Sequence, residues 1–373
     1  MKKRTILSIG IAMITLCFSC DLGLSGSGAE ANSGRAAGST DKIHIVGNSD
    51  DGTTSVACYW NGTRRTVLYN GKSDAYSVTV SGGTVYVAGC YYVLKNGNWF
   101  PVACAWVIGT GGVSRMYLPL PDNPSLLESG ATSITVANGT VYTSGYYNLG
   151  RQVIPCYWVG SYKRVDLPPN GDYFINLPKS ICVAATGTVY VGGVTNAGTQ
   201  TACYWTSEPG GSMTRTDLPA PGEGFSGYNA IAVSRGTIYA AGGYRVDSNS
   251  TPAACLWTSR GSAVRRAALN GFCTGSIYLS GTVPYIAGNY KDGTNTDVAC
   301  YWVRRTRVAL TNGCMAYAVF PAGGTVYAAG ITWNNKTQKI NACYWAGRNN
   351  MIKLPDVSAN NSTARAIYVV PGT

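Results

Sequence analysis

The stretch Ala57-Cys58-Tyr59-Trp60 decides the fold, because related tetrapeptides return six more times along the 373-residue chain. The other copies are Ala103-Cys104-Ala105-Trp106, Pro155-Cys156-Tyr157-Trp158, Ala202-Cys203-Tyr204-Trp205, Ala254-Cys255-Leu256-Trp257, Ala299-Cys300-Tyr301-Trp302 and Ala342-Cys343-Tyr344-Trp345. The first and last tryptophans lie 285 residues apart over six intervals, a mean period of 47.5 residues. A period of this size predicts a solenoid, a propeller or another array of repeats.

Three further motifs recur with the same multiplicity. They are a segment such as Val85-Tyr86-Val87-Ala88-Gly89, a short alternating run such as Ser77-Val78-Thr79-Val80, and a leucine such as Leu68 after the tryptophan. β-Branched and aromatic runs bounded by Gly, Asn or Pro are typical of strands. The pairs Asn138-Gly139 and Asn61-Gly62 are typical of tight hairpin turns. Four strands per unit, repeated seven times, predict an all-β, seven-bladed propeller.

The two ends of the repeat region favour a closed ring over a solenoid. The chain enters at Ile43-His44-Ile45, the second strand of a unit, and leaves at Ala366-Ile367-Tyr368-Val369, the first strand of a unit. One C-terminal strand and three N-terminal strands would complete a blade and leave no unpaired edge. We therefore predict one propeller over residues 43–373. His44 occupies a slot that Tyr fills in the other units, which indicates a structural role.

These motifs resemble the extracellular repeat family named for its His-Ala-Phe (HAF) signature, found in exported bacterial proteins. The resemblance covers about residues 43–370 and implies a propeller, with no catalytic residues to carry over. This chain departs from the signature, because the residue before Ala (or Pro) of the tetrapeptide is never His. The residues at that position are Val56, Val102, Ile154, Thr201, Ala253, Val298 and Asn341.

The N-terminus carries the parts of an export signal. Three basic residues after Met1 precede an apolar run, Thr5 to Phe18, which is too short for a membrane span. A Gly/Ser/Ala-rich stretch follows Cys20, which resembles the acylated cysteine of bacterial lipoproteins. We predict a signal peptide over 1–19, a lipidated flexible tether over 20–42, and a membrane-anchored protein in the periplasm or on the cell surface.

Composition excludes several kinds of chemistry. Only 12% of residues are charged, too few for ordinary amphipathic helices, and the aromatic and β-branched content argues against disorder. A single His leaves little material for a His-rich metal site or a Ser-His-Asp triad. The seven repeat cysteines are predicted to be buried free thiols. We expect no metal and no cofactor.

Positive charge follows the repeat. The net charge is +12, or +9 once Lys2, Lys3 and Arg4 are removed with the signal peptide. An arginine stands three residues before the repeat leucine in six units, and these residues form a predicted basic outer belt: Arg65, Arg115, Arg164, Arg215, Arg266 and Arg307. Charges on edge strands discourage edge-to-edge pairing. The alternative role of the basic outer belt is attraction of the protein to an anionic surface.

Aromatic residues in the loops of one face form the predicted binding face. They are Tyr91, Trp99, Phe100, Tyr173, Phe174, Phe225 and Trp333. Acidic residues occur in the same loops, namely Asp122, Glu128, Asp172, Glu223 and Asp356. A mixed aromatic and acidic face on a rigid scaffold is suited to a protein or glycan partner.

The sequence therefore predicts a monomeric, non-catalytic binding or scaffold module at the cell envelope, with no nucleic-acid partner. The alternative is an exported, glycosidase-like hydrolase that uses the loop carboxylates.

Overall fold

The computed structural model describes residues 41–50, 52–123, 125–150, 152–168, 176–196, 199–207, 212–219, 226–246, 252–355 and 361–372. In this part the chain forms seven four-stranded antiparallel sheets arranged as a seven-bladed propeller, which confirms the predicted fold. The predicted signal peptide, Cys20 and most of the tether lie outside the described residues. No described helix is long and apolar enough to cross a membrane.

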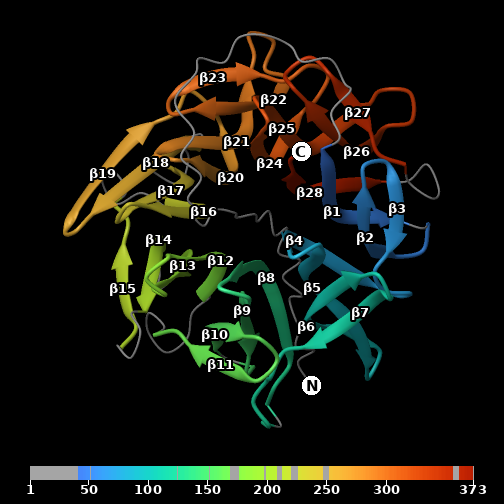
Figure 1. Cartoon of the computed structure of the whole chain (residues 1–373), viewed down its shortest axis with the longest axis vertical. Coiled ribbons are helices and arrows are strands. Elements are labelled where there is room, and N and C mark those ends of the chain that lie inside the picture. Colours follow the sequence, from blue (N-terminus) through green and yellow to red (C-terminus); the bar gives the residue numbers. More distant parts are fainter. Residues whose placement is uncertain are drawn as a thin grey trace, which may run out of the picture.

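Each blade has an inner strand, two middle strands and an outer strand (Figure 1). The inner strands are β28 (Ser362–Val370), β4 (Ser73–Ser81), β8 (Glu128–Ala137), β12 (Asn176–Val183), β16 (Ser226–Ser234), β20 (Cys273–Ser280) and β24 (Met315–Ala322). The second strands are β1 (Lys42–Asp50), β5 (Thr84–Lys95), β9 (Thr140–Asn148), β13 (Val189–Asn196), β17 (Thr237–Tyr244), β21 (Val283–Lys291) and β25 (Thr325–Asn334).

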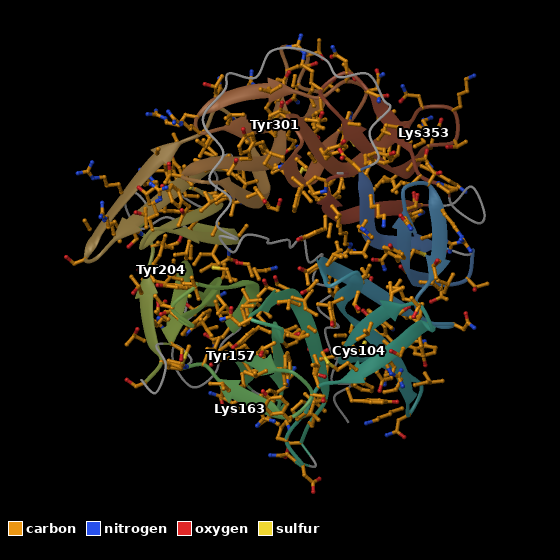
Figure 2. The ribbon with its side chains drawn as sticks, in the orientation of Figure 1. Cys104, Tyr157, Lys163, Tyr204, Tyr301 and Lys353 are labelled. Carbon is orange, nitrogen blue, oxygen red and sulfur yellow. The ribbon has the colours of Figure 1, made fainter. Side chains whose placement is uncertain are left out.

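The tetrapeptides lie in the third strands, and the belt arginines lie in the outer strands. The third strands are β2 (Ser55–Asn61), β6 (Asn98–Gly109), β10 (Val153–Val159), β14 (Gln200–Ser207), β18 (Ala253–Arg260), β22 (Asp297–Val303) and β26 (Lys339–Ala346). The outer strands are β3 (Arg64–Val67), β7 (Gly112–Tyr117), β11 (Lys163–Asp166), β15 (Thr214–Asp217), β19 (Ala263–Ala268), β23 (Thr306–Ala309) and β27 (Met351–Lys353). Figure 2 labels Tyr157, Tyr204 and Tyr301 in third strands, and Lys163 and Lys353 in outer strands.

Blade 1 contains both ends of the described chain and closes the ring. It is formed by β28, β1, β2 and β3, and the next six blades follow in sequence order from blade 2 (β4–β7) to blade 7 (β24–β27). In Figure 1 the red β28 lies beside the blue β1. Eight residues of β1, from Lys42 to Ser49, pair with β28. The predicted closure is therefore confirmed.

The repeat motifs form the packing between blades. All seven repeat tryptophans and all seven repeat leucines are buried. The indole N–H of Trp158 donates to the carbonyl of Pro119, two residues into the loop that leaves the preceding blade, at 2.8 Å. Trp60, Trp205, Trp257 and Trp345 make the equivalent bond to the preceding blade. Ten cysteines of the described part are free.

Each inner strand has a β-bulge at the same level. The register against the second strand shifts once in every blade, for example between Ala75 and Ser77 and between Pro178 and Ser180. The repeat glycine of the second strand faces this irregularity. A Cβ on Gly145 would overlap the carbonyl oxygen of Gly130 on β8, and five other blades show the same overlap at Gly47, Gly89, Gly193, Gly242 and Gly330. The glycine of the Val-Tyr-Val-Ala-Gly motif thus accommodates the bulge.

His44 is structural, as predicted from its place in the repeat. It is 7% exposed, and its Nδ1 lies 2.7 Å from the hydroxyl of Tyr59. The two rings stack at 5.9 Å between centroids. Burial, together with the smaller effect of the positive charge of Lys42, lowers the pKa of His44 to about 4. The imidazole is therefore neutral at physiological pH.

This pKa predicts acid sensitivity. The unfolded chain binds a proton at His44 near pH 6.5 and the folded chain only near pH 4, so stability falls as pH falls between these values. At pH 5 the protonation of His44 in the unfolded chain lowers the free energy of unfolding by about 2 kcal/mol. The substitution His44→Phe should remove this loss of stability at low pH. Urea unfolding at pH 7 and pH 5 should show the wild type losing about 2 kcal/mol more than the variant. Equal losses would contradict the assignment.

Candidate functional site

The inner strands begin, and the second strands end, on one face of the ring, which we call the upper face. Two carboxylates lie there on the inner strands of adjacent blades, Asp74 near the start of β4 and Glu128 at the start of β8. Both side chains are half-buried. Together with Tyr92 and Tyr146 they form what we call the mouth cluster.

Asp74 is oriented by donors from two blades. The hydroxyl of Tyr92 donates to its Oδ2 at 2.9 Å, and Asn48 of blade 1 donates to its Oδ1 through Nδ2. The same amide nitrogen reaches the backbone carbonyl of Ser73 at 3.0 Å. The ammonium of Lys72 lies 4.7 Å from the centroid of the Tyr92 ring. These contacts fix the position of the Asp74 carboxylate.

Glu128 and Asp74 act on the same phenol. Asn148 donates to Oε1 of Glu128 at 3.2 Å. Burial raises the pKa of Tyr146 well above its usual range, and the negative charges of Glu128 and Asp74 raise it further. Tyr146 packs over Gly130, where no side chain competes for the space. The phenol is therefore neutral, and the negative charges of two carboxylates from neighbouring blades act on it.

A pair of carboxyl groups beside neutral hydroxyl donors can carry acid–base chemistry. In glycoside hydrolysis one carboxyl group protonates the leaving oxygen, while the other activates water or attacks the sugar. Tyr92 and Tyr146 supply hydroxyl groups and aromatic surface beside the pair. Of the five loop carboxylates predicted from sequence, Glu128 belongs to the cluster and Asp122 is exposed. Asp172, Glu223 and Asp356 lie outside the described residues.

Of the predicted binding-face residues that the structure describes, Tyr91, Trp99 and Phe100 lie on the β5–β6 hairpin of blade 2, and Trp333 lies apart from them on blade 7. Trp99, 50% exposed, pairs across the strands with Leu94, 58% exposed, at the tip of the long β5–β6 hairpin. Trp333, 46% exposed, lies on blade 7, with blade 1 between it and Trp99. Phe100 is half-buried, and Tyr91 packs beside Tyr69. The other predicted members, Tyr173, Phe174 and Phe225, lie outside the described residues.

The belt arginines are held by contacts within their own blades. Each stands directly opposite the repeat tryptophan, as Arg115 does opposite Trp106. The guanidinium groups of Arg115, Arg164, Arg266 and Arg307 lie 3.7–4.7 Å from the ring centroids of Tyr91, Tyr147, Tyr244 and Tyr290. Arg164 and Arg215 form ion pairs with Asp166 and Asp217 at 2.8 and 3.0 Å. Arg65 donates to the sulfur of Cys58 at 3.1 Å. Attraction of this belt to an anionic surface remains a prediction.

Sequence reasoning missed the residues at the bulges of the inner strands. The seven bulges contain Tyr76, Thr132, Lys179, Asn229, Gly275, Tyr317 and Arg365. The neighbouring positions hold mostly small residues, whereas this position holds six different residue types in seven blades. That variability within a repeated motif was the available signal. In the described part, no group of His, Cys, Asp and Glu side chains is arranged to hold a metal ion.

Comparison with known proteins finds only remote similarity. No protein-family model and no curated protein matches the chain. Among solved structures, a protein of unknown function from Dyadobacter fermentans aligns over 82% of this chain and 97% of its own, with 10% identity and a TM-score of 0.48. A PL25 polysaccharide lyase, an ulvan lyase, aligns over 76% and 83%, with 11% identity and a TM-score of 0.48. A GH43_1 enzyme from Xanthomonas citri aligns over 68% and 89%, with 14% identity and a TM-score of 0.35.

These comparisons correct one expectation. The sequence predicted a protein that is not an enzyme, whereas the solved structures with a similar fold are mostly enzymes, including glycosidases and a polysaccharide lyase. The expectation of a protein that is not an enzyme is therefore corrected, whereas the alternative, a glycosidase-like hydrolase that uses carboxylates, needs no His. At 9–14% identity the similarity assigns no particular reaction to this chain.

Proposed function

We propose that this chain is an exported propeller that acts on a glycan at the cell envelope, with Asp74 and Glu128 as the reacting pair. The observation that carries this proposal is the position of the two carboxylates near the start of adjacent inner strands, where the negative charges of both act on Tyr146. One carboxyl group serves as the general acid and the other as the base or nucleophile.

The long hairpin of blade 2 supports a polymeric substrate. Tyr92, which binds Asp74, lies on β5 two residues before Leu94, and Leu94 pairs with Trp99. The hairpin therefore presents exposed apolar surface immediately above the mouth cluster. Aromatic side chains of this kind provide a platform for the apolar faces of sugar rings, which would hold a chain longer than the reacting unit.

Removing either carboxylate should abolish turnover. The variants are Asp74→Asn and Glu128→Gln, assayed by release of reducing ends from a panel of bacterial envelope polysaccharides. Because acid–base groups contribute about 10²–10⁴-fold, each variant should lose at least 100-fold in rate. Asp217→Asn, an exposed carboxylate on an outer strand, is the matched control and should stay within about twofold of the wild type. No release by the wild type, or full activity in both variants, would refute the proposal.

Anchoring through Cys20 is the second part of the proposal, and it rests on the export signal and the tether. Cys20→Ala should move the protein from the detergent phase to the soluble exported fraction, because two acyl signals are needed for stable membrane attachment and the variant would have none. Phase partitioning with Triton X-114 measures this change directly. Unchanged partitioning would show that the protein is held at the membrane in another way.

A further inference from the structure

The lower face of the ring lies opposite the mouth cluster. The inner and third strands end on it, and the second and outer strands begin on it. Six exposed basic residues lie at the hairpins that join third strands to outer strands, namely Arg64, Lys163, Arg260, Arg304, Arg305 and Arg348. Lys42 at the start of β1 and Arg235 between β16 and β17 are two more exposed basic residues on this face. We call these eight residues the lower basic surface, and none of them belongs to the basic outer belt.

Acidic residues in the described part of the chain lie almost entirely on the other face. Asp41 is the one described acid on the lower face, and its carboxylate accepts hydrogen bonds from the hydroxyl of Tyr327 and from the backbone N–H of Gly372, at 2.6 and 2.8 Å. Glu208, between β14 and β15, lies outside the described residues. The other described acids lie at strand ends or in loops of the upper face: Asp50, Asp74, Asp122, Glu128, Asp166, Asp217, Asp292 and Asp297. No ion pair of the described residues includes a member of the lower basic surface.

The lower basic surface extends around the ring. Lys42 and Arg64 lie in blade 1, Lys163 in blade 3 and Arg348 in blade 7, and blades 5 and 6 carry the other four residues. The hairpins are short, as at Val303–Thr306, so the basic residues stay close to the ends of their blades. A flat anionic surface contacts such an arrangement at several blades together, whereas a single polymer strand would follow one stripe of charge. The distribution therefore favours a membrane over a linear polyanion.

An exposed aromatic residue lies on the same face. Tyr162 is 75% exposed and lies in the turn between β10 and β11, next to Lys163. Tyrosine is enriched at the interface between a membrane and water, where its ring lies at the level of the headgroups. A tyrosine that contributes so little to packing within the propeller is thus suited to contact with a lipid surface.

The N-terminal segment joins the propeller on the lower face. The described chain begins at Asp41, one residue before β1, and twenty residues separate Asp41 from Cys20. A chain of this length spans at most about 70 Å. An acyl group on Cys20 would therefore keep the propeller near the membrane, and the attachment point would lie on the basic side of the ring.

We propose that the lower basic surface rests on the anionic phospholipid headgroups of a membrane, so that the mouth cluster points away from it. The anchor at Cys20 rests on the proposed function, whereas the charge of the lower face is independent of it. Each Lys or Arg close to an anionic leaflet strengthens binding about fivefold, and the attraction falls off within about 10 Å at 0.1 M salt. An acyl chain alone holds the protein nearby, whereas the basic face also sets the orientation of the ring.

The test is cosedimentation of residues 21–373 with lipid vesicles. This chain keeps every described residue of the closed ring and lacks Cys20, so that no acyl chain contributes to binding. The vesicles contain phosphatidylcholine alone or with about 30% phosphatidylglycerol, in about 0.05 M or 0.5 M sodium chloride. We expect binding to the anionic vesicles at low salt, at least tenfold weaker binding at high salt, and no binding to phosphatidylcholine alone.

Two triple variants with the same change of charge test the face. Lys163→Gln, Arg305→Gln and Arg348→Gln together should weaken binding to the anionic vesicles at least tenfold. The control combines Lys95→Gln, Arg245→Gln and Lys336→Gln, three exposed positions of the upper face, and should stay within twofold of the parent. Equal weakening in both variants would overturn the assignment to the lower face. Thermal unfolding of each variant without vesicles checks the fold.

Lysine labelling measures the orientation of the bound protein. With an amine-reactive acetylating reagent and mass spectrometry, anionic vesicles should protect Lys42 and Lys163 and leave Lys95 and Lys336 reactive. Protection of the upper-face lysines instead would overturn the proposed orientation. Binding of heparin without any binding of anionic vesicles would identify a polyanion site and overturn the membrane assignment. The assay uses a chain without Cys20 and measures no turnover, so its outcome is independent of the anchor and of the proposed reaction.

Discussion

Deletion of residues 362–373 leaves a chain without a cooperative unfolding transition. This segment carries β28, the inner strand of blade 1, and its Ala364, Ala366, Ile367 and Val369 are all buried. Its loss exposes the edge of β1 and the facing surfaces of the two neighbouring blades, and unpaired edges of this kind promote aggregation. We expect the variant to appear in the insoluble fraction and to show no sharp melting transition by circular dichroism.

The matched control removes only Gly372 and Thr373. This deletion costs one exposed hydrogen bond, from the backbone N–H of Gly372 to the carboxylate of Asp41. It should melt within about 3 °C of the parent, since a single exposed bond is worth about 1 kcal/mol. A chain without β28 that melts as sharply and as high as this control would mean that the blades are stable without ring closure.

Gly145→Ala has the second largest expected effect. The added Cβ would overlap the carbonyl oxygen of Gly130 and would lie 2.8 Å from the Trp158 ring. The inner strand and the buried tryptophan cannot both move aside in a packed blade, so we expect a loss of about 3 kcal/mol or more in the free energy of unfolding. Urea unfolding followed by tryptophan fluorescence measures this loss.

Gly109→Ala is the control for this substitution. Gly109 ends β6, and a Cβ there meets nothing within 4 Å. It should change stability by no more than about 0.5 kcal/mol. If Gly145→Ala were equally harmless, the repeat glycine would not be required by the bulge of the inner strand, and our explanation of the motif would be wrong.

Several features of the fold could be predicted from the sequence because they recur. A buried tryptophan that bonds to the preceding blade needs the same residue in each blade, so the number of blades can be counted from the tetrapeptides. The turn at Asn138-Gly139 was also predictable, since both residues have positive φ, 49° and 73°, as a tight hairpin turn requires. The belt arginines were located in the outer strands, but their stacking on tyrosines such as Tyr290 was not foreseen.

The candidate sites depend on residues that do not recur. Asp74 and Glu128 are 54 residues apart. In the sequence, Glu128 was one of five loop acids, and Asp74 stood inside a run that otherwise reads as an ordinary inner strand. Nothing in the local pattern shows where such a side chain points, because the bulge after Ala75 shifts the alternation of the strand.

The sequence by itself determined the architecture, namely seven four-stranded blades and a ring closed by its own last strand, because packing between identical units demands identical residues at fixed spacing. Only the tertiary structure decided which variable residues meet. Ring formation places the inner strands of adjacent blades side by side, so that Asn48 of blade 1 reaches Asp74 of blade 2. The positions of Asp74 and Glu128 on neighbouring inner strands follow from that arrangement.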